Sequence, residues 1–117
     1  MKTKKIQIIL GVLVLHCSAG TWAAVEIKTV TAARLLTDPA NYGYCMVYSP
    51  QLTFSVNCPG GWVSLDCKGS YHSKETSRLM WDAANLAYAT ESNVYVVVND
   101  ARKHNGYCVA DRLDVVK

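Results

Sequence analysis

The sequence predicts a mainly β domain with one helix, and three observations support this fold class. Strand-like segments rich in β-branched residues lie on both sides of one long helical pattern at residues 73–90. Short stretches containing Pro, Gly and Asn separate these segments. Four of the five cysteines follow residue 40, which favours disulfides in a small exported domain. We therefore expect one sheet or barrel with a single helix packed against it.

The stretch from Ser73 to Thr90 is predicted to be one amphipathic helix. Ser73 is a good N-cap because its hydroxyl can accept hydrogen bonds from free amides of the first turn. Glu75 lies in that turn, where the helix dipole favours negative charge. At about 100° per residue, six side chains share one broad face and are expected to be buried. They are Leu79, Met80, Ala83, Leu86, Ala87 and Thr90.

Residues 1–23 have the features of a secretory signal peptide. A positively charged start precedes an apolar run at residues 6–15, and Thr21-Trp22-Ala23 is an acceptable cleavage site. The apolar run is shorter than the ~20 residues that a spanning helix needs, so we expect no stable membrane insertion. Cys17 raises the alternative of a lipoprotein, although no small residue precedes it as such processing requires. Cleavage would leave residues 24–117 as a single secreted or periplasmic domain.

Loss of the signal peptide changes both the charge and the cysteine count. Three lysines leave with it, so nine Lys and Arg residues remain beside nine Asp and Glu residues. Nucleic-acid binders keep a basic excess on the folded domain, so DNA and RNA are not expected partners. Removal of Cys17 leaves four cysteines, an even number that suggests two disulfides in an oxidising compartment.

Five strands are expected around the helix, at residues 25–36, 44–48, 62–67, 93–99 and 107–116. The alternation of the first strand slips near residues 30–33, which indicates a bulge or bend, and a helical turn over 32–36 is the competing interpretation. Residues 52–56 would continue the second strand. In the third strand, Val63 and Leu65 are expected to point inward.

The order of these elements is three strands, a helix and two strands. It matches the OB-fold, a five-stranded barrel with its helix between strands three and four. An open α+β sheet with the helix on one face is the alternative.

The barrel suggests a pairing of the cysteines. A hairpin of strands two and three places Cys45 opposite Cys67, and parallel strands three and five bring Cys58 near Cys108. Since four cysteines allow three connectivities, Cys45–Cys67 and Cys58–Cys108 are a preference.

This layout resembles that of the B subunits of five-subunit bacterial toxins, of the subtilase-cytotoxin and pertussis-like type. The matching stretch runs from Tyr44-Cys45 through Cys67 and the helix to Val94–Val98, about half of residues 24–117. The resemblance implies a non-catalytic binding subunit for glycans, assembled as a ring of five. It equally fits a small family of exported proteins that shares only the fold. No glycan-binding motif aligns residue by residue, so no binding residue is carried over.

Aromatic residues outside the expected core favour an interface between copies of the chain. Trp81 and Tyr88 lie away from the apolar face of the helix, and Tyr95 and Val97 make the second face of their strand apolar. The alternative is that a small barrel buries these residues itself.

A binding surface is expected across strands two and three and the loops beside them, where OB-folds present ligands. Aromatic faces beside polar donors suit sugar rings, because C–H faces stack while hydroxyls need hydrogen bonds. Packing or solvated turns could equally explain each residue. The candidates are Tyr44, Tyr48, Trp62, Lys103, His104 and Asn105, with Tyr42 and Arg102 nearby.

No catalytic, metal or cofactor site is expected. His72 and His104 could join Asp66 or Asp100 in a metal or acid–base site, but no ligand spacing supports one. Three hypotheses result. The first is a glycan- or protein-binding subunit that forms a ring, the second a monomeric periplasmic OB-fold protein with a structural or stress role, and the third a small secreted hydrolase.

Overall fold

The computed structural model describes residues 24–38 and 41–117, so the predicted signal peptide lies outside the described residues. Six strands and one helix form in this part of the chain. In chain order they are β1 (Val25–Thr31), β2 (Arg34–Asp38), β3 (Tyr44–Tyr48), β4 (Trp62–Ser64), α1 (Lys74–Thr90), β5 (Asn93–His104) and β6 (Tyr107–Val116). The prediction of a mainly β domain with one helix is confirmed.

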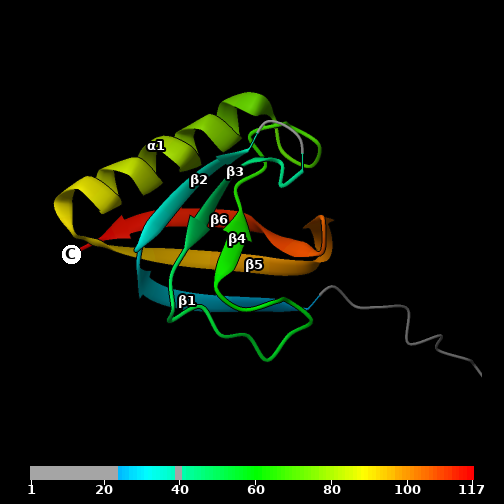
Figure 1. Ribbon diagram of the computed structural model, residues 1–117, viewed down its shortest axis with the longest axis horizontal. Coiled ribbons are helices and arrows are strands. Elements are labelled where there is room, and N and C mark those ends of the chain that lie inside the picture. Colours follow the sequence, from blue (N-terminus) through cyan, green and yellow to red (C-terminus); the bar gives the residue numbers. More distant parts are fainter. Residues whose placement is uncertain (1–23, 39–40) are drawn as a thin grey trace, which may run out of the picture.

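The strands form one mixed sheet in the order β1-β5-β6-β4-β3-β2 (Figure 1). Only β4 and β6 run parallel among the described strands, with Ser64 opposite Val109. The expected five-stranded barrel is wrong, because the stretch predicted as one strand over 25–36 is two strands at opposite edges. β1 pairs with β5 and β2 pairs with β3.

The break between β1 and β2 falls at Ala32 and Ala33, inside the stretch where the alternation slips. Val30 and Ala32 are both buried, so the chain stays against the core where β1 ends and β2 begins. The Ala33 amide already donates to the Tyr48 carbonyl at 2.9 Å, which starts the pairing with β3. The competing helical turn over 32–36 is also wrong.

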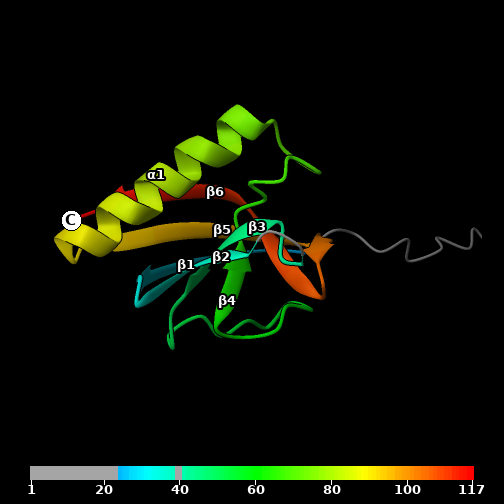
Figure 2. The same cartoon turned by 45° about the horizontal axis from the view of Figure 1, so that its top comes forward.

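Helix α1 crosses one side of the sheet and packs mainly against β6 (Figure 2). The predicted cap is confirmed, since the Ser73 side chain accepts from the Thr76 amide. The predicted face is wrong in part: Leu79 and Leu86 are 64% and 56% exposed. The side chains that pack on the sheet are Ser77, Met80, Ala84 and Ala87.

The rotation of the helix has a steric cause. The buried face lies about 70° from the predicted one, by the 3.6-residue period. Three of its four residues are small, which lets the helix backbone lie close to the strands. The prediction followed hydrophobicity alone and therefore placed the two large leucines, Leu79 and Leu86, on the buried face.

Two disulfides are present, Cys45–Cys67 and Cys58–Cys108, the pairs that the predicted strand order favoured, and each joins a strand to a loop. They indicate an oxidising environment, extracellular or periplasmic. Val63 and Leu65 are fully buried as expected, within a core that also contains Val47 and Val96. Residues 52–56 form no strand. Of the residues that the structure describes, none belongs to a helix with the length and apolar character of a membrane span.

Candidate functional site

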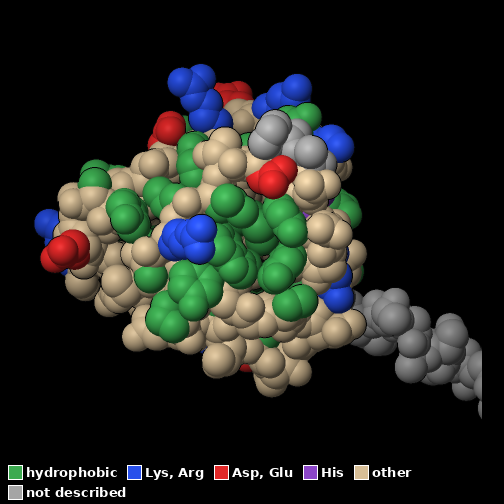
Figure 3. All heavy atoms as spheres, in the orientation of Figure 1, with side chains coloured by type: hydrophobic (Ala, Val, Ile, Leu, Met, Phe, Trp, Pro, Cys, Tyr) green, Lys and Arg blue, Asp and Glu red, His purple; other side chains and the backbone are tan. Residues whose placement is uncertain are grey.

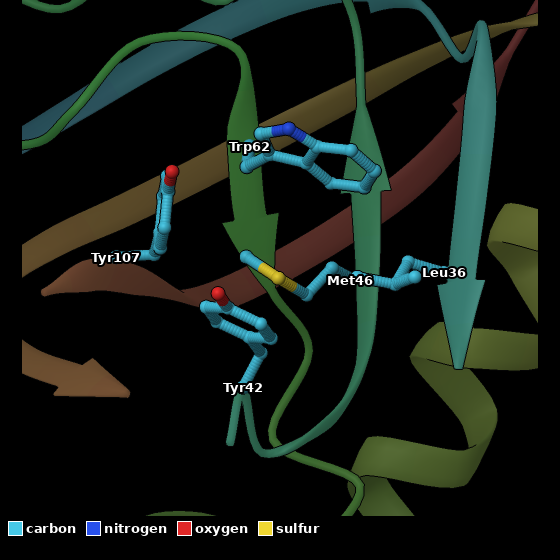
Figure 4. Close-up of a pocket in the computed structure, with 5 residues that line it drawn as sticks. All are labelled: Leu36, Tyr42, Met46, Trp62 and Tyr107. Carbon is cyan, nitrogen blue, oxygen red and sulfur yellow. The ribbon is translucent and has the colours of Figure 1, made fainter. Parts of the chain in front are cut away.

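A shallow aromatic groove lies on the face of β3 away from the core. It has a volume of about 160 Å³, and we call it the aromatic groove. Figure 4 shows Met46 in the middle, Leu36 on one side, Tyr42 and Tyr107 on the other, and Trp62 above. Its lining residues are Leu36, Tyr42, Met46, Trp62 and Tyr107.

Strand register brings these side chains together. Leu36 pairs with Met46 across β2 and β3, and Tyr48 pairs with Trp62 across β3 and β4. Because side chains alternate along a strand, Met46, Tyr48 and Trp62 share the face opposite Val47. Met46 is only 1% exposed yet lies outside the main core cluster, so it forms the floor of the groove.

The aromatic rings of this face contact one another in pairs. The ring centroids of Tyr42 and Tyr107 are 5.7 Å apart at 71°, and those of Tyr48 and Trp62 are 5.1 Å apart at 48°. The guanidinium of Arg34 lies 5.6 Å from the Trp62 ring centroid, within cation–π range. Figure 3 shows hydrophobic side chains gathered over β2, β3 and β4, with a basic side chain among them.

A buried polar network lies beside the groove and is centred on Asp66, which is fully buried. Its carboxylate accepts from three backbone amides at 2.8–3.0 Å, and from His104 Nε2 at 2.6 Å. Ser64 links this network to the groove, because its hydroxyl donates to the Tyr42 carbonyl at 2.8 Å and accepts from the Asp66 amide at 3.2 Å. The three amides belong to Ser70, Tyr71 and His72.

Two opposing effects set the pKa of Asp66. Burial would raise it, but the hydrogen bonds from the His72 amide, the His104 ring and the amides of Tyr71 and Ser70 together outweigh burial. The pKa is therefore lowered below the ordinary value of 3.8, and the carboxylate is ionised at neutral pH. Since an ionised carboxylate only accepts, His104 donates through Nε2.

The two histidines that suggested acid–base chemistry have structural contacts. His104 is bonded to Asp66, while His72 Nε2 lies 2.8 Å from the Ala110 carbonyl and 3.8 Å from Asp111 Oδ1. Asp66 is enclosed and uses its oxygens to hold the loop before α1. Within residues 24–38 and 41–117, no cluster of three or more His, Cys, Asp or Glu could hold a metal ion.

The structure brings together two of the six predicted ligand residues, Tyr48 and Trp62. Tyr44 lies elsewhere, because its positive φ of 77° breaks the alternation that would align it with Met46. Lys103, His104 and Asn105 belong to the β5–β6 hairpin. The backbone carbonyl of Lys103 accepts from Tyr71 Oη, and Asn105 has the positive φ of a tight turn.

Sequence reasoning missed three residues of the groove, Leu36, Met46 and Tyr107. Alternation with Tyr48 could have pointed to Met46, which lies two residues before it. Leu36 reaches the groove because it pairs with Met46 across β2 and β3. Tyr107 reaches it because β6 runs beside β4. No local pattern carries that information.

The four predicted interface residues are separated between the helix and β5. Trp81 is half-buried, Tyr88 is 51% exposed, and Tyr95 and Val97 are half-buried on the outer face of β5. The guanidinium of Arg112 lies 5.4 Å from the Tyr95 ring centroid. The structure therefore leaves Tyr88 as the one large apolar side chain of this set that is mostly open to solvent.

The aromatic groove is suited to hold one flat or ring-shaped apolar face, because rings and a thioether surround a small hollow. Tyrosine hydroxyls and a guanidinium at its rim can make polar contacts with the same ligand. The five residues that line the groove include no carboxylate, histidine or cysteine. Comparison with protein-family models, with curated proteins and with solved structures finds no match for this chain.

Proposed function

We propose that this protein is an exported, non-catalytic binding protein whose aromatic groove takes a glycan. The observation that carries the proposal is the position of Trp62, which is half-buried between Tyr48 and the groove with Arg34 over its ring. A sugar ring offers C–H faces to aromatic rings and hydroxyls to polar groups, and this rim supplies both.

The size of the groove favours one ring of a longer ligand. Its volume of about 160 Å³ is below the roughly 300 Å³ at which pockets begin to enclose drug-sized ligands. A glycan bound here would insert one residue and extend the rest along the surface. The other sugar residues of the glycan would then contact the hydrophobic surface around the groove, which Figure 3 shows.

The strand order also supports this proposal. If β1 and β2 are counted as one strand bent at Ala32 and Ala33, the order is first-second-third-fifth-fourth and returns to the first. That is the strand order of an OB-fold, although the sheet here is not a closed barrel. The groove lies on the second and third strands by this count, where OB-folds present ligands.

Two apolar surfaces support assembly into a ring, as in the toxin subunits that the layout resembles. One lies on α1, where Leu79 and Leu86 are both exposed on the same face. The other is the outer face of β1 and β5, where Ile27 is 52% exposed and pairs with Val97. A ring needs two different surfaces that meet head to tail, and these lie on different elements.

Glycan binding can be tested with the oxidised protein on a glycan array, followed by calorimetry with any glycan that binds. We expect Trp62→Ala to weaken binding about 30-fold or more, because a central aromatic contact is worth about 2 kcal/mol. Tyr44→Ala is the matched control, since Tyr44 lies outside the groove and should leave the affinity unchanged.

An array without a single bound glycan contradicts the proposal and favours a structural or stress role. Equal losses in Trp62→Ala and Tyr44→Ala would also contradict it, because they would move the binding site away from the groove.

A further inference from the structure

A second pocket lies between the β2–β3 edge of the sheet and the N-terminal half of α1. Its volume is about 340 Å³, twice that of the aromatic groove, and the two share no lining residue. Its size falls within the range of about 300–1,000 Å³ typical of ligand pockets. The residues that matter here are Tyr44, Cys45, Cys67, Lys74, Arg78 and Trp81.

The walls of this second pocket are covalently and sterically fixed. Cys45 and Cys67 are joined by a disulfide, so the strand wall and the loop before α1 cannot separate. Tyr44 has a φ of 77°, a conformation that non-glycine residues adopt only when their surroundings impose it. That backbone sets its ring at the pocket, while Trp81 brings a second aromatic ring from the helix.

Two cations lie at the second pocket, and the acidic residues of α1 closest to them in sequence, Glu75 and Asp82, form no ion pair with either. Lys74 and Arg78 are one helical turn apart on α1, and no ion pair involves either one among the described residues. Like charges at this spacing repel and cost the helix stability. Their joint position at a hollow with aromatic walls therefore marks a place where a negative charge would be favourable.

We propose that the second pocket binds a small organic anion that carries an acidic group on an aromatic body. Lys74 and Arg78 would hold the acidic group, with the guanidinium able to donate two parallel hydrogen bonds. Tyr44 and Trp81 would contact the aromatic body. This site goes beyond the proposed glycan groove and does not depend on it.

The probe for the test is naphthalenesulfonate, added to the full oxidised chain. Binding is followed through the indole N–H resonances, which single Trp62→Phe and Trp81→Phe variants assign. We expect the Trp81 resonance to shift and saturate, while the Trp62 resonance stays in place. Naphthol, which lacks the charge, and inorganic sulfate, which lacks the rings, should each bind at least about tenfold more weakly.

The variant Lys74→Gln/Arg78→Gln removes both charges and should weaken naphthalenesulfonate binding about tenfold or more. Its matched control is Lys28→Gln/Lys117→Gln, which loses the same charge at positions outside the pocket and should bind normally. Added salt should weaken binding to the unmodified protein, a measurement that needs no variant.

Three results would overturn the proposal: no saturable shift of Trp81, equal binding of naphthol, or unchanged affinity in Lys74→Gln/Arg78→Gln. A shift confined to Trp62 would assign the probe to the aromatic groove and would equally exclude the second pocket. Failure of glycan binding has no bearing on these outcomes.

Discussion

Asp66 holds the connection from β4 to α1 in place. Three consecutive amides, from Ser70 to His72, point at one carboxylate that is fully enclosed, and His104 reaches it from the far hairpin. A buried carboxylate is unfavourable unless its lone pairs are filled, and here they are. One residue thus ties the helix start to the β5–β6 hairpin, next to the aromatic groove.

Replacing Asp66 by Asn should lower the free energy of unfolding by about 3–5 kcal/mol at neutral pH, since an amide group cannot accept from all four donors. Folding lowers the pKa of Asp66, so its contribution is complete above the unfolded value and is lost as pH falls through the folded pKa. Denaturant titrations from neutral pH down into that acid range should show a smaller loss of stability in Asp66→Asn than in the unmodified protein.

The matched control is Asp114→Asn, which breaks an exposed ion pair with Arg112. It should change stability by less than about 1 kcal/mol. Similar destabilisation in both variants would mean that the Asp66 network contributes no more than a surface pair.

At the scale of elements, the turn into β3 decides which side chains reach the aromatic groove. Gly43 and Tyr44 are both left-handed, with φ of 71° and 77°. Gly43 also lies against its neighbours, since a Cβ there would be 2.5 Å from His104 Cδ2 and 2.7 Å from Ser64 Oγ. The turn is therefore fixed by contact with the polar network as well as by backbone conformation.

Gly43→Ala should destabilise the protein by about 2–4 kcal/mol, because strain of about 1 kcal/mol from the positive φ adds to overpacking against two fixed side chains. Gly106→Ala is the matched comparison: its φ is 86°, but a Cβ would meet nothing within 4 Å. Gly106→Ala should lower the free energy of unfolding only by the backbone strain, about 1 kcal/mol. Equal melting temperatures for the two variants would contradict the close packing around Gly43.

Local chemistry in the sequence was sufficient to predict several elements. Ser73 marks the helix start, and β3 and β6 were both found by their residue types. Cysteine spacing combined with strand order gave both disulfides. The bend near residues 30–33 was expected, but the placement of β1 and β2 at opposite edges of the sheet was missed, as was the rotation of α1. Each depends on how distant elements approach one another, which no local pattern encodes.

The same distinction applies to the candidate site. Tyr48 and Trp62 could be grouped because both lie on predicted strands that pair as a hairpin. Tyr44 was wrongly predicted to lie on the same surface as Tyr48 and Trp62. Its positive φ is imposed by surrounding contacts, and the identity of the residue does not indicate it. The second pocket could not be predicted, since it joins a strand, a loop and a helix face.

At the scale of the whole molecule, near-neutral charge and two apolar surfaces favour self-association. Over residues 24–117, acidic and basic residues are equal in number, so net repulsion between copies of this part of the chain is small. Leu79 and Leu86 form a line on α1, and Val25 and Ile27 extend along the edge strand β1. Each is the kind of exposed apolar surface that marks an interface.

Light scattering on a sizing column should give a native mass of five protomers for the oxidised protein. Leu79→Glu/Leu86→Glu should reduce it to one protomer, because two charges would be buried in the contact. The control Asn85→Glu/Ala89→Glu adds the same charges at other exposed positions of α1 and should keep the ring. A single-protomer mass of the unmodified protein at every concentration would exclude the ring and leave Tyr88, Tyr95 and Val97 as ordinary surface residues.

The separation of β1 from β2 has a consequence for the order of folding. β2 can pair with β3 as soon as the next dozen residues exist, but Val25 pairs with Asn99, near the other end of the chain. Contacts so distant in sequence form late, because the long intervening loop must first be closed. Among the described strands, the first to be synthesised is thus among the last to be paired. Until β5 exists, β1 has no partner in the sheet, and a segment that exposes valine and isoleucine in that interval is where aggregation would begin.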